Sequence, residues 1–297
     1  MVQSHKVFDK IVIMKELDFI NIIKEQTGGN LLGDDCAYIK ELGIVVTQDN
    51  FVEDVHFKRS WATPFQIGYK AAVVNISDIL ASGGKPEYIT VGLSLPKDID
   101  ECFIKDFYKG VQAGLYGAKI VGGDITGADK IFISITAIGS TKGRRISSRA
   151  FAKPGYVLIT RGKYGLSSKG LEELSNGKRS SENISAHLEP KLEPSFSEQI
   201  STKIKTDYAM MDTSDGLADA LFRIAEASNC TIDADYIEGM FGAEDYNLVA
   251  AVPEEFLKEL QDYYIIGRVK KYSDFLLKIG DKTFSNYDDL GLYNHFS

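Results

Sequence analysis

The sequence lacks the short motifs that identify several large classes of nucleotide-binding and hydrolytic enzymes. It has no GxxxxGK(S/T) phosphate-binding loop, and no two of its 27 glycines stand two positions apart, so a GxGxxG loop is excluded. It has neither a GxSxG nucleophile elbow nor an HExxH zinc motif. Composition alone leaves a Ser-His-Asp hydrolase open, but no motif indicates one. The four histidines, which form no pair with metal-ligand spacing, are His5, His56, His187 and His295.

Cysteines and long apolar runs are also scarce. Cys36, Cys102 and Cys230 are odd in number, far apart and in no CxxC pattern, so we expect neither disulfides nor structural zinc. No apolar run approaches the roughly 18 residues that span a bilayer, and the N-terminal MVQSHKVFDK has no signal-peptide core. The sequence therefore predicts a cytoplasmic protein with no membrane partner.

The charge balance argues against nucleic acid as a partner. The formal net charge is −8, whereas nucleic-acid binding depends on Lys and Arg residues that neutralise phosphates. With 297 residues, of which 44% are hydrophobic and 26% charged, the chain has an ordinary globular composition and a length that favours about two domains. An acidic protein that binds an anionic substrate needs local positive charge, and bound Mg²⁺ would supply it.

Aspartates recur where short apolar or small-residue runs end. They are Asp34, Asp35, Asp49, Asp78, Asp124, Asp212 and Asp215. Carboxylates repel one another, so a fold that gathers several of them needs a cation, and oxygen ligands of this kind suit Mg²⁺ held together with substrate phosphates. The alternative is that aspartate is common in turns and helix N-caps, which explains any one of these residues more readily than all of them. The pattern favours an enzyme that binds polyphosphate through metal.

The first half of the chain alternates predicted strands and helices. The clearest element is a helix over 63–84, because Thr63 can cap it, Pro64 suits its first position, and apolar residues follow at helical spacing. Asn75 and Asp78 lie one turn apart in this helix, so their side chains share a surface. A second helix is predicted over 100–117, and strands are predicted in GIVVTQDNFVEDVHF, YITVGLSLP, KIVGGD and IFISITAIGS.

The second half follows a break in this pattern. Residues 141–155 (TKGRRISSRAFAKPG) are basic, polar and marked by Gly and Pro, which is typical of a solvated inter-domain linker. Beyond them, strands are predicted in YVLITRG, YAMMDTSDG and YNLVAAVP, and helices in GLSSKGLEEL, DGLADALFRIAEAS and 253–263. Residues 176–189 are expected to form a loop in solvent. Two α/β halves fit this organisation, with domains over 1–145 and 146–297.

Eight sequence blocks occur in an order that resembles the thiamine-monophosphate kinase family: GDDCAYI, VVTQDNFVEDVHF, YKAAVVNISDILASGG, KIVGGDIT, RAFAKPG, MDTSDGLADAL, GAEDYNLVAAVP and LYNHF. That family belongs to a superfamily of ATP-binding proteins with aminoimidazole ribonucleotide synthetase, selenophosphate synthetase and a hydrogenase maturation factor. The resemblance runs over nearly the whole chain. It implies an α/β (α+β) fold in which the N-terminal sheet pairs with that of a second copy in a dimer barrel, followed by a C-terminal α/β domain.

The resemblance also implies an activity and a set of residues. The activity is ATP-dependent phosphorylation of thiamine monophosphate to thiamine diphosphate by a homodimer, with several Mg²⁺ ions in each site. The implied metal ligands are Asp35, Thr47, Asp49, Asp78, Asp124, Asp212 and Asp215. The implied ATP contacts are Tyr116, Gly123, Asp124, Arg149 and Ser214, and the implied acceptor contacts are His56, Glu244 and Tyr293. The catalytic roles would fall to Asp49, Asp124, Arg149 and Asp212.

The residues suit this chemistry without the resemblance. Phosphoryl transfer asks mainly for positioning and for neutralisation of charge, and little covalent chemistry. By analogy with phosphorylated side chains, the acceptor phosphate has a second pKa of about 6, so it is already ionised at neutral pH and needs no general base. Mg²⁺ ions between carboxylates and phosphates would bring the two anions together, and Arg149 would add a planar fork of donors.

Some of these residues also have a simpler structural explanation. Asp34 is expected in a turn beside the site rather than as a ligand. Asp212 and Asp215 could cap the helix that begins near Gly216, although capping and coordination can coexist. His56 on its own would be an ordinary surface or core histidine.

The sequence departs from the family pattern in two places, and other functions remain open. Gln48 stands where the family has Ser or Thr beside the metal-binding aspartate, and the stretch over 230–244 is shorter than the pattern, which bears on the acceptor pocket. One alternative is a superfamily member with another acceptor, but residues 1–30 lack the cysteine of selenophosphate synthetase and the chain ends NHFS without the cysteine of the maturation factor. The second is a degenerate ATP-binding protein without turnover.

Overall fold

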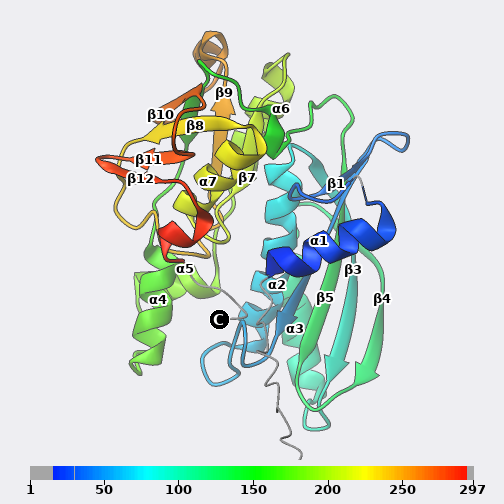
Figure 1. Cartoon of the computed structure of the whole chain (residues 1–297). Helices are drawn as coiled ribbons and strands as arrows, with labels where there is room; N and C mark the ends of the chain where they lie inside the picture. The colour runs from blue at the N-terminus through cyan, green and yellow to red at the C-terminus, as the bar shows by residue number, and fades with distance from the viewer. Residues whose placement is uncertain (1–15, 30, 293–297) are drawn as a thin grey trace, which may run out of the picture.

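The computed structural model describes residues 16–29 and 31–292, which form two α/β units side by side (Figure 1). The N-terminal unit holds a sheet with strand order β1-β2-β5-β3-β4, and the C-terminal unit holds one with order β12-β11-β8-β10-β6-β9-β7. The prediction of a mixed α/β fold in two parts is confirmed. No helix in the described ranges is long and apolar enough to cross a bilayer.

The N-terminal sheet is covered on one face by a pair of helices. Its strands are β1 (Ala37–Ile39), β2 (Ile44–Val52), β3 (Lys85–Leu95), β4 (Lys119–Gly127) and β5 (Phe132–Ser140). Neighbouring strands are antiparallel except β3 and β4, which are parallel. α2 (Pro64–Ala81) packs on β2, β3 and β5, and α3 (Glu101–Ala113) packs against α2. α1 (Glu16–Thr27) precedes the sheet.

The long helix α2 begins and ends where the sequence predicts. The Thr63 side chain accepts from the backbone N–H of Gln66, whose own side chain accepts from the Thr63 N–H, so the two form a capping box ahead of Pro64. Helices α2 and α3 then approach closely. A Cβ added at Gly68 would lie 2.1 Å from the carbonyl oxygen of Phe107, so only glycine fits this crossing.

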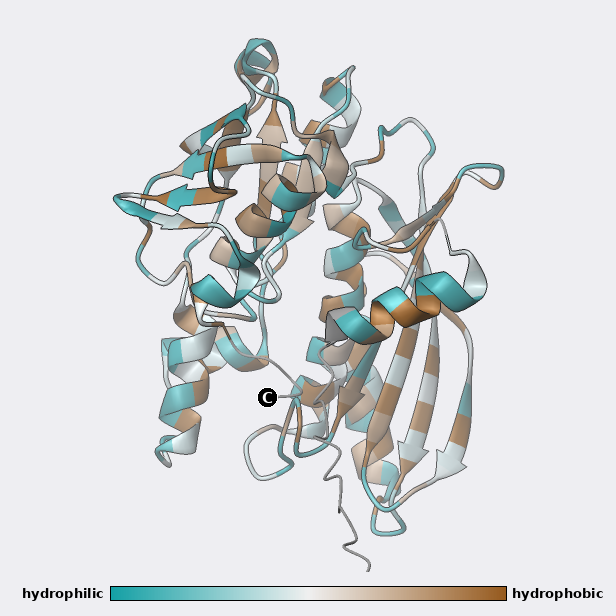
Figure 2. Cartoon of the chain, viewed as in Figure 1, coloured by the Kyte–Doolittle hydropathy of each residue, from teal (hydrophilic) through white to brown (hydrophobic). Residues whose placement is uncertain are grey.

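The edge strand β4 is exposed along its whole length. Its large apolar side chains face solvent, with Ile120 37%, Val121 57% and Ile125 65% exposed. Figure 2 shows hydrophobic residues along β4. An open strand edge with exposed apolar residues is a template for pairing with another chain, which is relevant to the predicted dimer.

The C-terminal sheet contains the strands that carry the second group of aspartates. They are β6 (Val157–Thr160), β7 (Ala209–Asp212), β8 (Cys230–Ala234), β9 (Leu248–Val252), β10 (Tyr264–Lys271), β11 (Leu277–Ile279) and β12 (Lys282–Phe284). β8 and β11 are parallel, and the other pairs are antiparallel. α7 (Leu217–Ala227) follows β7 directly and buries its apolar face against β7 and β8.

The remaining helices correct the sequence prediction in two places. They are α4 (Leu166–Ser175), α5 (Glu182–Leu188), α6 (Pro194–Lys203) and the 3₁₀ turns η1 (Arg149–Phe151), η2 (Glu254–Glu259) and η3 (Tyr287–Leu290). The prediction of a solvent loop over 176–189 is wrong, because α5 buries Ile184, His187 and Leu188. A seven-residue helix is too short to show helical periodicity. The helix expected over 253–263 is only the 3₁₀ turn η2.

The two units share one apolar core across α2. Residues of the N-terminal sheet and α2 belong to the same buried cluster as residues of β6, β7, β9 and α6. The segment expected as a solvated linker is partly fixed: the Ser147 hydroxyl, itself buried, donates to the carbonyl oxygen of Met210 and accepts from its N–H. Arg145 pairs with Asp207 at 2.6 Å. Helix α2 therefore contributes to the core that the two units share.

Candidate active site

Three carboxylates meet where α2 faces β7. They are Asp35 in the segment before β1, Asp78 near the end of α2, and Asp212 at the end of β7; one oxygen of each lies within 4.8 Å of the others. Asp212 is 2% exposed and its side chain is enclosed by both units. The structure thus gathers predicted metal ligands from both halves of the chain.

The electrostatics of this group call for a cation. Burial, the largest effect, raises the pKa of Asp35, Asp78 and Asp212, and for Asp212 the value reaches about 7. The neighbouring carboxylates add to the shift at Asp78 and Asp212 by direct repulsion. Buried carboxylates that repel one another in this way are hard oxygen donors whose charge a divalent ion would balance, so the residues present fit Mg²⁺.

Two further predicted ligands lie on β2 beside this group. The Thr47 hydroxyl donates a 2.6 Å hydrogen bond to Asp78 Oδ2. The Asp49 N–H donates to Asn75 Oδ1 at 3.0 Å, and burial raises the pKa of the Asp49 carboxyl, which lies within hydrogen-bonding reach of Asp78. The helical spacing predicts that Asn75 and Asp78 share a surface of α2. Through this surface both residues bind β2 and hold it against the helix.

Two serines hold the carboxylate of Asp212. Ser77, which is fully buried on α2, donates to Asp212 Oδ2 at 2.6 Å, and Ser214 donates through its hydroxyl to Asp212 Oδ1 at 3.0 Å. The N-cap residue of α7 is Gly216, so neither Asp212 nor Asp215 occupies the N-cap position of this helix.

Arg149 supplies the positive charge next to the carboxylates. Its Nη2 lies 2.6 Å from Asp35 Oδ1; burial alone would lower the pKa of Arg149, but the ion pair with Asp35 raises it. The Arg149 Nε is buried and has no hydrogen-bond partner in the described residues, so one donor remains for a ligand. Asp34 accepts from the Arg149 N–H at 2.8 Å and from Ser148, as expected of a turn residue beside the site.

Four predicted site residues lie outside this group. Asp124 sits on β4, exposed, and Asp215 is exposed near Arg223. Gly123, also on β4, has φ +156°, and a Cβ there would lie 2.0 Å from the Val91 carbonyl oxygen. This close approach explains, without any role in binding, why a glycine occupies the position. Tyr116 accepts from the Leu192 N–H at 2.9 Å, in a contact between the two units.

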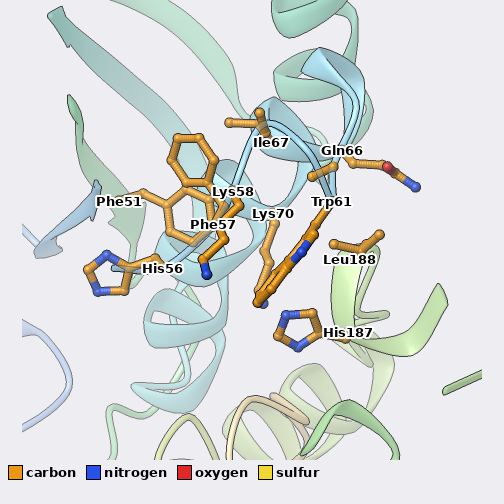
Figure 3. A pocket seen from close by; sticks show the side chains of 11 residues that line it. Phe51, His56, Phe57, Lys58, Trp61, Gln66, Ile67, Lys70, His187 and Leu188 are labelled. Atoms are coloured by element: carbon orange, nitrogen blue, oxygen red, sulfur yellow. The ribbon is translucent and has the colours of Figure 1, made fainter. Parts of the chain in front are cut away.

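A second constellation lies beside the N-terminal half of α2. It is a narrow pocket, open to solvent, between α2, α5 and the segment that joins β2 to α2 (Figure 3). Aromatic rings form its walls: Phe51 and Phe57 stack with centroids 5.0 Å apart, and Phe51 also stacks on His56 at 5.5 Å. Trp61 stands on the opposite side in Figure 3. The walls of the pocket are therefore mostly aromatic.

Lys70 and His187, two polar residues that line this pocket, both contact Glu244. Its Oε1 lies 3.1 Å from Lys70 Nζ, and its Oε2 lies 3.3 Å from His187 Nδ1. Burial acts to raise the pKa of Glu244, but Lys70 and His187 outweigh it and the pKa is lowered. Burial, with Lys70 beside it, lowers the pKa of His187 to about 4, so at neutral pH this ring is uncharged. His56 accepts from the Val52 N–H at 3.0 Å through Nδ1.

Comparisons with known proteins agree with this geometry. Residues 33–141 match the family model described as AIR synthase related protein, N-terminal domain. The thiamine-monophosphate kinase of Bacillus subtilis is 34% identical, over 95% of this chain and 100% of the relative. The chain belongs to the thiamine-monophosphate kinase family. Another member, from Aquifex aeolicus, is 32% identical over 86% of this chain and 92% of its own.

Solved structures of the family share the fold. The structure described as AaThiL complexed with AMPPCP and TMP has a TM-score of 0.85 at 29% identity, covering 97% of this chain and 100% of that one. The crystal structure of thiamine monophosphate kinase from Aquifex aeolicus has a TM-score of 0.83 at 29% identity, covering 94% and 100%. The hydrogenase maturation protein HypE, at 21% identity, 84% and 88% coverage and a TM-score of 0.63, shows the fold alone.

For this member of the kinase family, sequence reasoning missed three residues of the two constellations. Lys70, Ser77 and His187 each contact a predicted site residue. A signal existed for the first: Lys70 is a cation inside an apolar helical run, and Ser77 follows it by two turns on the same face. His187 gave no signal, because α5 was not recognised. Tyr293 lies outside the described residues.

Proposed function

We propose that this protein transfers the γ-phosphoryl group of ATP to the phosphate of thiamine monophosphate and releases thiamine diphosphate and ADP. One observation carries the proposal: α2 holds a buried carboxylate group at its C-terminal end and an aromatic, polar pocket beside its N-terminal half. A family member of the same fold is described in complex with AMPPCP and TMP, that is, with a nucleotide analogue and an acceptor together.

The reaction needs no proton acceptor from the protein. An oxygen of the acceptor phosphate forms a bond to the γ-phosphorus, and the bond from this phosphorus to the β–γ bridging oxygen breaks, so that ADP leaves. The acceptor phosphate has a second pKa of about 6 and is ionised at neutral pH. The task that remains is to hold two anions in line, which is a task of positioning and charge.

We assign the carboxylate group to metal binding. Asp35, Asp78 and Asp212, with Asp49 and Thr47, would hold several Mg²⁺ ions, and Asp124 and Asp215 remain proposed ligands on family grounds. A Mg²⁺ ion held there would supply the positive charge that neutralises phosphate oxygens.

The chain's own cation acts next to this group. The free Nε of Arg149 offers a donor to a phosphate oxygen while Asp35 fixes the guanidinium. Ser214, which donates to Asp212, is also proposed as a nucleotide contact on the ground of the resemblance. Tyr116 and Gly123 are kept as nucleotide contacts from the resemblance alone. In this assignment Asp49, Asp124, Arg149 and Asp212 carry the catalytic roles.

The aromatic pocket would take the acceptor. His56, which lines it, and Glu244, which contacts its lining residues Lys70 and His187, would supply polar contacts to the thiamine moiety, and Tyr293 is proposed to help close it. The shorter 230–244 stretch does not remove Glu244, whose N–H donates to the Ser214 carbonyl oxygen at 2.7 Å. That bond joins the acceptor pocket to the loop that carries Asp212.

We also propose the larger assembly. The N-terminal unit (1–145) would bind Mg²⁺ and ATP and pair its sheet with that of a second copy, and the exposed β4 edge supports this pairing. The C-terminal unit (146–297) would complete the site. As a consumer of ATP, the homodimer would work in the cytoplasm.

The test is direct. The protein is incubated with Mg²⁺, ATP and thiamine monophosphate, and thiamine diphosphate and ADP are quantified together. Equal amounts of both products are expected, and Asp49→Asn and Asp124→Asn should each abolish turnover in a protein that stays folded. If the protein binds ATP but phosphorylates none of a panel of phosphate-ester acceptors, the proposal is rejected and the protein is a non-catalytic nucleotide-binding protein.

A further inference from the structure

Lys70 is a buried cation whose hydrogen-bonding capacity is only partly used. It is 2% exposed, Glu244 lies 3.1 Å from its ammonium, and its Nζ makes no hydrogen bond of good geometry in the described part of the chain. The side chain lines the aromatic pocket, and in Figure 3 it extends past the Trp61 ring toward His187. A buried ammonium has three donors, and leaving them unmet costs free energy, so the site indicates a ligand that accepts.

The position of Lys70 along α2 decides which end of the acceptor it meets. Lys70 precedes Asp78 by eight residues, which corresponds to about 12 Å along the helix axis. Helical side chains also tilt toward the N-terminus, which moves the ammonium further from the carboxylate group. If the acceptor phosphate lies at the metal-binding end, Lys70 is separated from it by a distance comparable to the extended length of thiamine monophosphate.

We propose that Lys70 and Glu244 together form a donor–acceptor pair that binds the aminopyrimidine ring of the acceptor, with His187, 3.3 Å from Glu244, holding the carboxylate in place. The proposal rests on the proposed function, because it takes thiamine monophosphate as the acceptor. It adds Lys70 as a residue that determines specificity for the ring farthest from the phosphate.

The chemistry of the pocket selects this ring over the thiazolium. The thiazolium nitrogen is alkylated, so this ring has no lone pair to accept from the Lys70 ammonium and no amino group to donate to Glu244. The ring nitrogens of an aminopyrimidine accept from an ammonium, and its exocyclic amino group donates to a carboxylate, which matches Lys70 and Glu244. The stacked Phe51 and Phe57 rings and Trp61, which the Lys58 ammonium covers at 4.4 Å, give the pocket an aromatic lining that suits a heteroaromatic ring.

The experiment compares two acceptors on Lys70→Met. One is thiamine monophosphate; the other is the N-methyl thiazolium phosphate ester, which keeps the charged ring and the phosphate but lacks the pyrimidine. The variant should lose about 10- to 100-fold in kcat/KM for thiamine monophosphate, the size expected for a hydrogen bond to a charged group, and lose less than about 2-fold for the truncated acceptor. Equal losses on both acceptors, or no loss on either, would overturn the proposal.

Matched controls separate this proposal from folding and from the proposed function. Lys105→Met removes the lysine of an exposed Lys–Glu pair on α3 and should leave both kcat/KM values unchanged. Lys70→Gln, a neutral donor of similar length, is the second variant should the Met variant not fold, and the same selective loss is expected of it.

Binding can be followed without turnover. Trp61 is the single tryptophan of the chain and lines the pocket, so its fluorescence reports occupancy. Phosphate-free thiamine should quench it, and Lys70→Met should raise the Kd for thiamine by about 10-fold or more. If the parent protein makes no thiamine diphosphate but shows this difference, the proposed function fails and the ring-binding role stands; an unchanged Kd rejects the role.

Discussion

Ser77 on α2 donates a 2.6 Å hydrogen bond to Asp212 Oδ2 on β7, and so joins the N-terminal unit to a carboxylate of the C-terminal unit. Both residues are buried, with Ser77 at 0% and Asp212 at 2% exposure. A hydrogen bond in such a place has two effects: it satisfies a carboxylate that burial disfavours, and it sets the angle at which that carboxylate faces Asp35 and Asp78.

Ser77→Ala should therefore weaken both stability and nucleotide binding. Loss of a buried donor to a carboxylate costs about 1–3 kcal/mol of unfolding free energy, and loss of a residue that orients a ligand lowers metal affinity about 10- to 100-fold. Denaturant titration and calorimetric titration with Mg²⁺-ATP measure the two effects. Ser175→Ala, which removes an exposed serine on α4, is the matched control and should change neither. Unaltered Mg²⁺-ATP affinity in Ser77→Ala would contradict the orienting role.

Asp78→Asn should stabilise the metal-free protein and remove its response to Mg²⁺. The substitution deletes one of the mutually repelling buried charges, while the amide oxygen can still accept from Thr47. The parent should gain thermal stability when Mg²⁺ is added, by about 2.7 kcal/mol at a hundredfold excess over the Kd, and lose it with a chelator. Asp106→Asn on the surface of α3 is the control. A Mg²⁺-dependent shift in melting temperature that survives in Asp78→Asn would refute the metal site.

The sequence predicts the elements around these carboxylates better than the contacts between them. Helix α2 could be placed because Thr63, Pro64 and the glycines after it are local signals. The sequence predicts that several aspartates act together as oxygen ligands, because carboxylates that repel one another need a cation. It does not predict that Asp35, Asp78 and Asp212 are the three that lie together. The exposed position of Asp124 on β4 carries no signal in the sequence, because it depends on which strand forms the sheet edge.

The contacts around the proposed acceptor pocket could not be predicted from the sequence. The pairing of Lys70 with Glu244 joins residues far apart in the chain and depends on how the two units pack, which no local pattern specifies. The position of His187 could not be predicted because the sequence does not indicate helix α5. This short helix is stabilised by the burial of three side chains against its surroundings rather than by its own sequence.

The neutral state of His187 predicts a pH dependence of stability. Its pKa is about 4 in the folded protein and about 6.5 when unfolded, so between these values the unfolded chain binds more protons. Stability from this residue is therefore complete above about pH 6.5 and is lost as the pH falls toward 4. Asp212, with its raised pKa, acts in the opposite sense over part of the same range, so the comparison must be with a variant.

His187→Gln supplies that comparison. Unfolding free energies are measured by denaturant titration from pH 4 to pH 7.5 in both proteins, and their difference isolates the histidine. The parent's advantage over the variant should shrink steadily below about pH 6.5. A difference that does not change with pH would mean that His187 titrates alike in both states.

Charges on β4 should prevent the proposed dimer. Ile125→Lys places a cation at a position that is 65% exposed in the single chain and buried in a paired sheet. Light scattering coupled to size-exclusion chromatography should give a dimeric mass for the parent and a monomeric mass for the variant. Tyr272→Lys, at an exposed site of the C-terminal unit, is the matched control and should stay dimeric. A monomeric parent would reject the assembly.

Among the contacts that helix α2 makes with the C-terminal unit, Lys70 pairs with Glu244 and Ser77 donates to Asp212, both from one face of the helix. Since the Glu244 N–H is bonded to Ser214 and Ser214 to Asp212, the two C-terminal carboxylates form one connected piece. A ligand that orders either end therefore lowers the entropy still to be lost at the other. Nucleotide and acceptor should each tighten the binding of the other by the same factor, as thermodynamic reciprocity demands.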